Sequence, residues 1–133
     1  MKLNENITDA LATYIFESQQ NEYDDQVIHK YKRALMDYLC AAITGSIMPV
    51  PNSLLEYLIE IDSNEISSVI GKSVKMSPLN AALMNGTSAH SLDFDDGHTH
   101  GSIHIGTTVF PAIFAVAEQY KSTQKEFMNA AII

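Results

Sequence analysis

Residues 81–119 read AALMNGTSAHSLDFDDGHTHGSIHIGTTVFPAIFAVAEQ, and we expect the rest of the chain to be arranged around the loop in this stretch. Its two ends, 81–90 and 107–119, are apolar and rich in alanine, as is typical of buried helices. The middle, 90–106, is polar, is punctuated by glycines, and holds four of the five histidines and three clustered aspartates. Such a loop is costly to order because its backbone groups need partners, and loops of this kind usually carry function. We therefore place the functional site here.

Apolar residues at helical spacing predict two helices near the start of the chain. The first covers roughly residues 4–20. The second covers about 25–44, starts at Asp24 or Asp25 and ends before Gly45. Its wide apolar stripe leads us to expect a central helix; the stripe contains Val27, Ile28, Tyr31, Ala34, Leu35, Tyr38, Leu39 and Ala42. His29 falls among the polar positions of this helix, so we expect it on the surface.

Proline, serine and glycine mark the next boundaries. Pro49 and Pro51 predict a turn, after which Asn52 or the following serine caps a third helix, LLEYLIEI. Residues 65–76 are rich in serine and β-branched side chains and predict an extended, partly exposed piece with a turn at Gly71.

The fourth helix is expected to begin at Ser77 and Pro78, a capping hydroxyl followed by proline at the first helical position, and to run to about His90. Gly86 inside this helix costs about 1 kcal/mol relative to alanine. We therefore expect Gly86 to mark close packing against a neighbouring helix.

A fifth helix is expected from near Gly106 to about Tyr120, with Pro111 in its first turn, where proline is tolerated. Ser122 or Thr123 then caps a sixth helix. The predicted fold class is all-α, with about six helices in a single, partial helical domain over residues 1–133.

Composition narrows the possible partners. With 8 Lys+Arg against 16 Asp+Glu the net charge is −8, which argues against nucleic acid or an anionic membrane as partner. No stretch reaches the roughly 18 apolar residues of a membrane span, and the start, MKLNENITDALATY, lacks the apolar run of a signal peptide. The single cysteine, Cys40, has apolar neighbours, so we expect a small buried side chain and a reducing, cytoplasmic compartment.

The end of the sequence, FMNAAII, stops within an apolar pattern. We therefore expect the chain to be a fragment of a longer enzyme. Alanine-rich helices and exposed apolar side chains also lead us to expect a homo-oligomer.

Among the carboxylates of the loop, Asp93 lies between Leu92 and Phe94, which we expect to anchor in the core and to hold Asp93 in place. Asp95 and Asp96 have two interpretations that the sequence leaves open. They can be helix caps and turn formers, with Asp96 and the next glycine in a tight turn, or they can be site groups.

The histidines allow a metal site or proton chemistry. His98, His100 and His104 could ligate a metal such as zinc. However, metal-binding histidines sit on rigid elements with supporting partners, and three glycines interrupt this loop. Proton transfer, or the binding of a carboxylate substrate, is therefore the favoured role, without metal or cofactor. His90 is expected to be a hydrogen-bonding residue at the helix end.

The segments NAALMNGTSAHSLDFDDGH (80–98) and HIGTTVFPAIFAVAE (104–118) together resemble the MmgE/PrpD family. This family includes 2-methylcitrate dehydratase, cis-aconitate decarboxylase and iminodisuccinate epimerase. Two further segments, YKRALMDYLCAAITGS (31–46) and SVIGKSVKMSPLNAALMNG (68–86), resemble it more weakly, so that the resemblance covers most of residues 25–120.

The resemblance implies that this chain is the N-terminal part of a large helical domain, without the remaining helices and the smaller lid domain. It implies Asp93 and His104 as catalytic residues, with Asp96, Gly97 and His98 as substrate contacts. Two positions depart from the family pattern, because Gly97 replaces a common threonine and Ile105 a common proline; His100 has no counterpart role.

The implied activity is dehydration, decarboxylation or epimerisation of a small di- or tricarboxylate by proton transfer beside a carboxylate. The fragment alone is expected to be inactive. The alternatives are a metal-binding helical protein that uses His98, His100 and His104, and a helical interaction module without chemistry.

Overall fold

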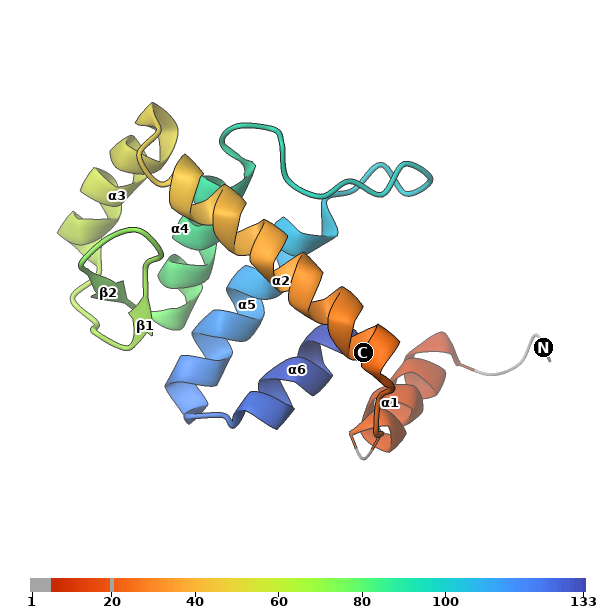
Figure 1. The fold of residues 1–133 in the computed structure, drawn as a ribbon. Helices are drawn as coiled ribbons and strands as arrows, with labels where there is room; N and C mark the ends of the chain where they lie inside the picture. The colour runs from red at the N-terminus through yellow and green to blue at the C-terminus, as the bar shows by residue number, and fades with distance from the viewer. Residues whose placement is uncertain (1–5, 20) are drawn as a thin grey trace.

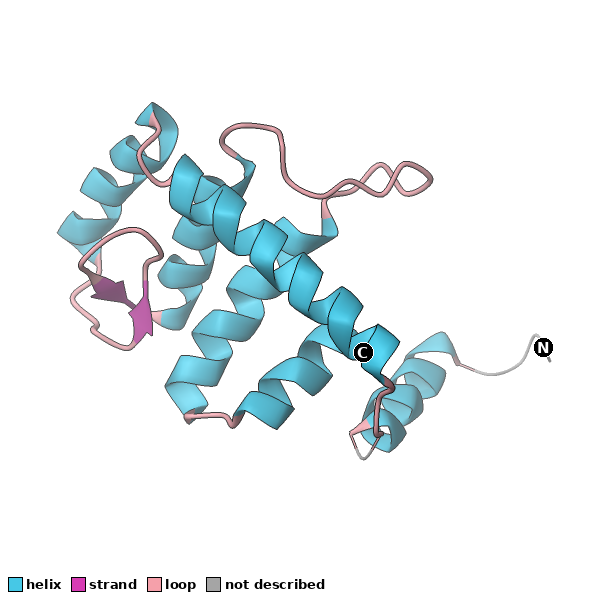
Figure 2. Ribbon diagram, in the orientation of Figure 1, coloured by secondary structure: helices cyan, strands magenta, loops and turns pink. Residues whose placement is uncertain are grey.

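The computed structural model describes residues 6–19 and 21–133, which form six helices and one two-stranded sheet (Figure 1). The elements are α1 (Ile7–Ser18), α2 (Asp25–Gly45), α3 (Pro49–Ile61), β1 (Ser67–Ser68), β2 (Lys75–Met76), α4 (Pro78–His90), α5 (Ile105–Tyr120) and α6 (Gln124–Ile132). The predicted all-α class is confirmed (Figure 2). Residues 4, 5 and 20 of the predicted first helix lie outside the described residues.

Helix α2 contacts α4, α5 and α6, as expected for a central helix, but α4 is more central still. Helix α4 contacts α2, α3, α5 and both strands. It contributes Ala89 to a core cluster with Tyr38 and Phe110, and Ala81 and Met84 to a second cluster with Leu58, Val69 and Met76. The small side chains of α4 let neighbours approach on several sides. The stripe of α2 is fully buried near its C-terminal end, and its residues Tyr31, Leu35 and Leu39 are partly buried and pack against the first cluster.

Two glycines bring helix backbones into direct contact at α4. A Cβ atom on Gly45, the last residue of α2, would overlap the carbonyl oxygen of Ser88 on α4. A Cβ atom on Gly86 would lie 3.1 Å from the carbonyl oxygen of Thr107 on α5. The predicted close packing at Gly86 is therefore confirmed.

Pro111 lies inside α5, beyond the first turn to which the sequence assigned it, because the helix begins at Ile105. Proline has no N–H, so the carbonyl of Thr107 four residues earlier lacks its intrahelical donor. This is the carbonyl that faces Gly86. The interruption in α5 is thus buried against the glycine of α4.

Two other predictions are wrong for geometric reasons. Helix α3 begins at Pro49, so both prolines lie in its first turn, where an N–H needs no intrahelical partner.

Cys40 is exposed. The buried face of α2 holds positions 38, 41, 42 and 45, at helical spacing, and position 40 lies off this face.

The extended piece predicted for residues 65–76 is confirmed as an antiparallel pair of short strands, with Gly71 at φ +76° in the turn. The buried side chain of Asn85 on α4 holds this piece in place. Its Oδ1 accepts from the N–H of Ile70 at 2.8 Å, and its Nδ2 donates to the carbonyl of Ser68 at 3.0 Å.

Helix α4 starts at Ser77 and Pro78 as predicted, but the Ser77 hydroxyl does not cap the helix. It donates instead to Asp62 Oδ2 at 2.6 Å, an atom that also accepts from Ser77 N and Asn80 Nδ2, both at 2.8 Å. Hydrogen bonds from the Ser77 side chain and then from Asn64 hold the pKa of the Asp62 carboxyl well below its usual range. Asp62 therefore fixes the start of α4 to the end of α3.

Among the described residues, no single helix is long and apolar enough to cross a membrane. In the described part of the chain, the pair α2 and α3, bent by 80°, has the necessary length and composition.

We predict that Gly45→Ala lowers the free energy of unfolding by about 3 kcal/mol, because the new methyl group forces α2 and α4 apart. Gly97→Ala is the matched control, since nothing lies within 4 Å of its Cβ position, and we expect a gain of at most about 1 kcal/mol. Urea unfolding followed by circular dichroism measures both. Equal stability of the two variants would contradict the backbone contact.

A second prediction concerns how the stability of the fold depends on pH. A carboxyl group with a lowered folded-state pKa stabilises the fold above its unfolded-state pKa of about 3.9 and stops doing so as the pH falls toward the folded-state pKa. Asp62→Asn should therefore lower the melting temperature most near neutral pH, and the difference from the unmodified chain should shrink below about pH 4. Glu60→Gln, at an exposed position of α3, should show no such pH-dependent difference. A difference in melting temperature between Asp62→Asn and the unmodified chain that does not change with pH would contradict the stabilising role of the Asp62 carboxylate.

Candidate active site

The chain between α4 and α5, residues 91–104, extends away from the helices and returns (Figure 1). Its tip is a short hairpin in which the N–H of His98 donates to the carbonyl of Ile103 at 2.9 Å. A second backbone bond runs from Gly101 N to the carbonyl of His98 at 3.1 Å. The loop that the sequence singled out thus has internal hydrogen bonds of its own.

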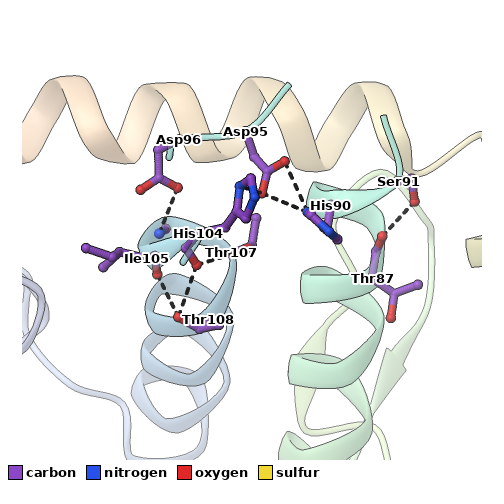
Figure 3. Close-up of polar contacts among 10 residues, drawn as sticks. Thr87, His90, Ser91, Asp95, Asp96, His104, Ile105, Thr107 and Thr108 are labelled. Carbon is purple, nitrogen blue, oxygen red and sulfur yellow. Dashed lines mark hydrogen bonds and ion pairs between the residues drawn. The ribbon is translucent and has the colours of Figure 1, made fainter. Parts of the chain in front are cut away.

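At the base of the hairpin, the carboxylate of Asp95 lies between the imidazoles of His90 and His104 (Figure 3). Its oxygens lie 3.2 and 3.1 Å from His90 Nδ1, and Oδ2 also lies 3.1 Å from His104 Nδ1. The Asp95 side chain is 1% exposed, against 53% for His90 and 36% for His104. A buried carboxylate therefore joins two histidines that solvent can reach.

These three residues come together because of where the helices end. His90 is the last residue of α4 and His104 is the N-cap residue of α5. Helices α4 and α5 pack side by side, so the two rings lie with centroids 4.7 Å apart. The close contact at Gly86 that brings the helices together also brings the histidines together.

The two histidines are not held equally. The contact from His90 Nδ1 to Asp95 has hydrogen-bond geometry. His104 Nδ1 is as close to Asp95, yet it is a buried atom without an aligned hydrogen-bond partner. We regard the His104–Asp95 contact as electrostatic with poor alignment, because the distance is short and the angle is unfavourable.

Asp96 caps the start of α5. Its Oδ1 accepts from the N–H of Gly106 at 2.8 Å (Figure 3). A Cβ atom at Gly106 would lie only 2.6 Å from the same oxygen, so this contact requires glycine. Of the two interpretations left open for Asp96, the structure shows the cap; its contact with substrate stays a prediction.

Asp93 is exposed and has φ 53°, in the left-handed region that aspartate tolerates better than most residues. The next residue, Phe94, is 53% exposed. The expectation that Phe94 anchors Asp93 in the core is therefore wrong. Asp93 lies at the surface of the loop, and its catalytic role stays a prediction.

Gly97, His98 and His104 line a shallow pocket of about 200 Å³ on the hairpin. Three of the predicted site residues are thus together in one pocket. The pocket lining also includes the hydroxyl residues Thr99 and Ser102.

The metal set proposed from the sequence is not assembled. Within residues 6–19 and 21–133, the three potential ligands gathered within 4.8 Å are His90, Asp95 and His104. His98 and His100 lie with their ring centroids 6.2 Å apart and do not join this group. Sequence reasoning thus missed His90 as a site residue and left Asp95 undecided.

A larger hollow of about 600 Å³ lies beside the strands, lined in part by Asp62, Lys72 and Lys75. Its lysines already have partners, since Lys72 donates to Asn52 at 2.7 Å and Lys75 pairs with Glu118 at 3.1 Å. We therefore place the candidate site at the base of the hairpin, where the unsatisfied Nδ1 of His104 faces a buried carboxylate.

Fold and site together define a helical domain that presents an aspartate and two histidines at the junction of adjacent helices. A family model described as the MmgE/PrpD N-terminal domain matches residues 9–133. The chain belongs to the MmgE/PrpD family. The resemblance drawn from the loop and its flanking helices is confirmed.

Three curated relatives are named as cis-aconitate decarboxylases or similar to them. The chain is 33% identical over 120 residues to cis-aconitate decarboxylase of Homo sapiens, covering 90% of this chain and 25% of that protein. It is 26% identical over 125 residues to cis-aconitate decarboxylase-like protein oryM of Aspergillus oryzae, covering 93% and 26%. For cis-aconitate decarboxylase of Aspergillus terreus the identity is 22% over 127 residues, covering 96% and 26%. The chain spans about a quarter of the length of these relatives.

Proposed function

We propose that this chain supplies one wall of the active site of an MmgE/PrpD-type lyase that acts on a small di- or tricarboxylate. The observation that carries the proposal is the buried carboxylate of Asp95 held between two solvent-accessible imidazoles. Decarboxylation is the first candidate among the family's reactions, because the three relatives described above are named for it. Dehydration and epimerisation use the same kind of proton transfer and are the second candidates.

In decarboxylation the bond between carbon and the departing carboxylate breaks, carbon dioxide leaves, and a proton replaces it on carbon. His104 is suited to deliver that proton, because histidine changes protonation near neutral pH and its ring borders the pocket. Asp93, exposed on the same loop, is proposed to place the substrate or to share the proton transfer. Gly97, His98 and Asp96 are proposed to contact the substrate.

A substrate with several carboxylates needs positive charge around it. Among the residues that line the hairpin pocket, only His98 and His104 can become cationic. Further cationic groups must come from elsewhere in a longer parent protein. We therefore propose that this chain alone does not turn over substrate, because losing the opposing groups removes both orientation and charge stabilisation.

A metal-binding role is the second candidate function. Two imidazole nitrogens and one carboxylate oxygen within 4.8 Å are a donor set that zinc accepts. The Nδ1 atoms face Asp95, so a metal that shares the carboxylate with both rings would be bound through these two nitrogens. The tautomer measurement described below separates such an Nδ1-bound metal site from the lyase site.

In a full-length parent enzyme, we predict that Asp93→Asn or His104→Ala lowers turnover by roughly 10²-fold or more, the usual scale for one acid–base group. His29→Gln is the control, because His29 is exposed on α2, away from the loop, and it should leave turnover unchanged. The assay follows consumption of cis-aconitate or a related polycarboxylate. Normal turnover by a folded Asp93→Asn enzyme, or turnover by the 133-residue chain alone, would contradict the proposal.

We also propose that the chain self-associates. The apolar face of α1 does not reach the core: Leu11 is 56% and Ile15 49% exposed. Contiguous exposed apolar surface favours association, so light scattering at micromolar concentration should report dimers or larger species. Leu11→Ser combined with Ile15→Ser should lower that mass, while Glu17→Gln on the same helix should not. A monomeric mass for the unmodified chain would refute this.

A further inference from the structure

We propose that Asp95 is a positioning residue that fixes both His90 and His104 as the tautomer protonated on Nδ1. Each ring then presents Nε2 as its proton acceptor. This inference rests on the proposed function for its catalytic meaning, but the tautomers themselves can be measured without any turnover.

The chemistry of the carboxylate carries the inference. An ionised carboxylate can only accept hydrogen bonds. Asp95 Oδ2 lies 3.1 Å from Nδ1 of both His90 and His104. A nitrogen lone pair at that distance would repel the oxygen, whereas an N–H would bond to it. Both Nδ1 atoms therefore carry the proton, and in a neutral imidazole Nε2 is then the acceptor.

Burial strengthens this constraint. The Asp95 side chain is 1% exposed, so water cannot satisfy its oxygens in place of the imidazoles. His104 Nδ1 is likewise buried and has no aligned partner, so Asp95 is the acceptor nearest to it. A small rotation of the imidazole aligns the bond, and such bonds commonly tighten only when substrate is present.

A third histidine, His98 in the hairpin, is held in the opposite tautomer. His98 Nδ1 accepts from the backbone N–H of Gly101 at 3.0 Å. Because the Gly101 N–H is the donor of this bond, His98 Nδ1 must accept through its lone pair and carries no proton. The proton of the neutral His98 ring therefore lies on Nε2. The hydrogen-bond partner of each Nδ1 atom thus sets the tautomer of that ring. His98 serves as an internal reference for the measurement on His90 and His104.

The consequence for the reaction is a proton acceptor of defined tautomer beside the pocket that His104 lines. Nε2 of His104 can take a proton from a substrate carbon, forming an N–H bond while the C–H bond breaks and its electron pair stays on the substrate. The resulting imidazolium is stabilised by the charge of Asp95. In the reverse direction the same imidazolium returns the proton to carbon.

The test is a long-range ¹H–¹⁵N correlation spectrum of this chain with labelled histidine, recorded near pH 8, where an ordinary histidine is neutral. His90→Gln, His98→Gln and His104→Gln assign the three signals. We expect His90 and His104 to show a protonated Nδ1 and an unprotonated Nε2, and His98 to show the reverse. Either His90 or His104 protonated on Nε2 in the unmodified chain would overturn the proposal.

Asp95→Asn, which keeps the shape of the side chain, tests the cause. Loss of the carboxylate should shift His90 and His104 toward a mixture of tautomers while the His98 pattern stays unchanged. Unchanged tautomers in a folded Asp95→Asn chain would overturn the role of Asp95. The measurement on the unmodified chain decides the matter if the variant does not fold.

Zinc provides an independent test, because a metal bound through the two Nδ1 atoms would need the lone pairs of both nitrogens. Addition of equimolar Zn²⁺ should leave the His90 and His104 signals in place. Loss of both Nδ1 protons on adding Zn²⁺ would overturn the positioning role in favour of a metal site. Failure of the lyase proposal alone would instead show as the expected tautomers together with a parent enzyme that is indifferent to His104→Ala.

Discussion

Direct backbone contact at α4 is the constraint on which the rest of the structure depends. Gly45 lets the end of α2 reach the carbonyl of Ser88, and Gly86 lets α5 reach α4 where Pro111 leaves a carbonyl without its helical donor. A side chain at either glycine would push the helices apart. The ends of α4 and α5 carry His90 and His104, so helix spacing sets histidine spacing directly.

The elements that the sequence predicted well are those with strong local signals. Asp24 accepts from Val27 N at the start of α2, and Thr123 forms a capping box with Glu126 at the start of α6. Ser77 marked the right boundary for a different reason, since its hydroxyl bonds to Asp62, fifteen residues earlier in the chain. That partner has no local signature. The misplaced start of α3 arose because two prolines fit a turn and a first helical turn equally well.

The arrangement of the candidate site could be predicted only in part from the local sequence. The chain offers aspartates at 93, 95 and 96, and residue type alone cannot tell which of them turns inward. The folded loop decides this, since Asp93 has a positive φ and lies exposed, whereas the Asp95 side chain is buried against the histidines at the helix ends. His90 was assigned a role at the helix end, which is where it lies, but its carboxylate partner follows from the path of the loop. Such pairings depend on tertiary structure.

The bridge between His98 and Ile103 separates two parts of the loop. The bridge joins the two segments that enter and leave the tip, so residues 99–102 form a small closed loop. A change in the length of this loop does not alter the distance between Asp95 and His104. Exposed, closed tips tolerate insertion and deletion at little entropic cost. The tip also contributes Thr99 and Ser102 to the pocket lining. The tip can therefore change in length and reshape the mouth of the pocket while Asp95 and His104 keep their positions at the helix ends.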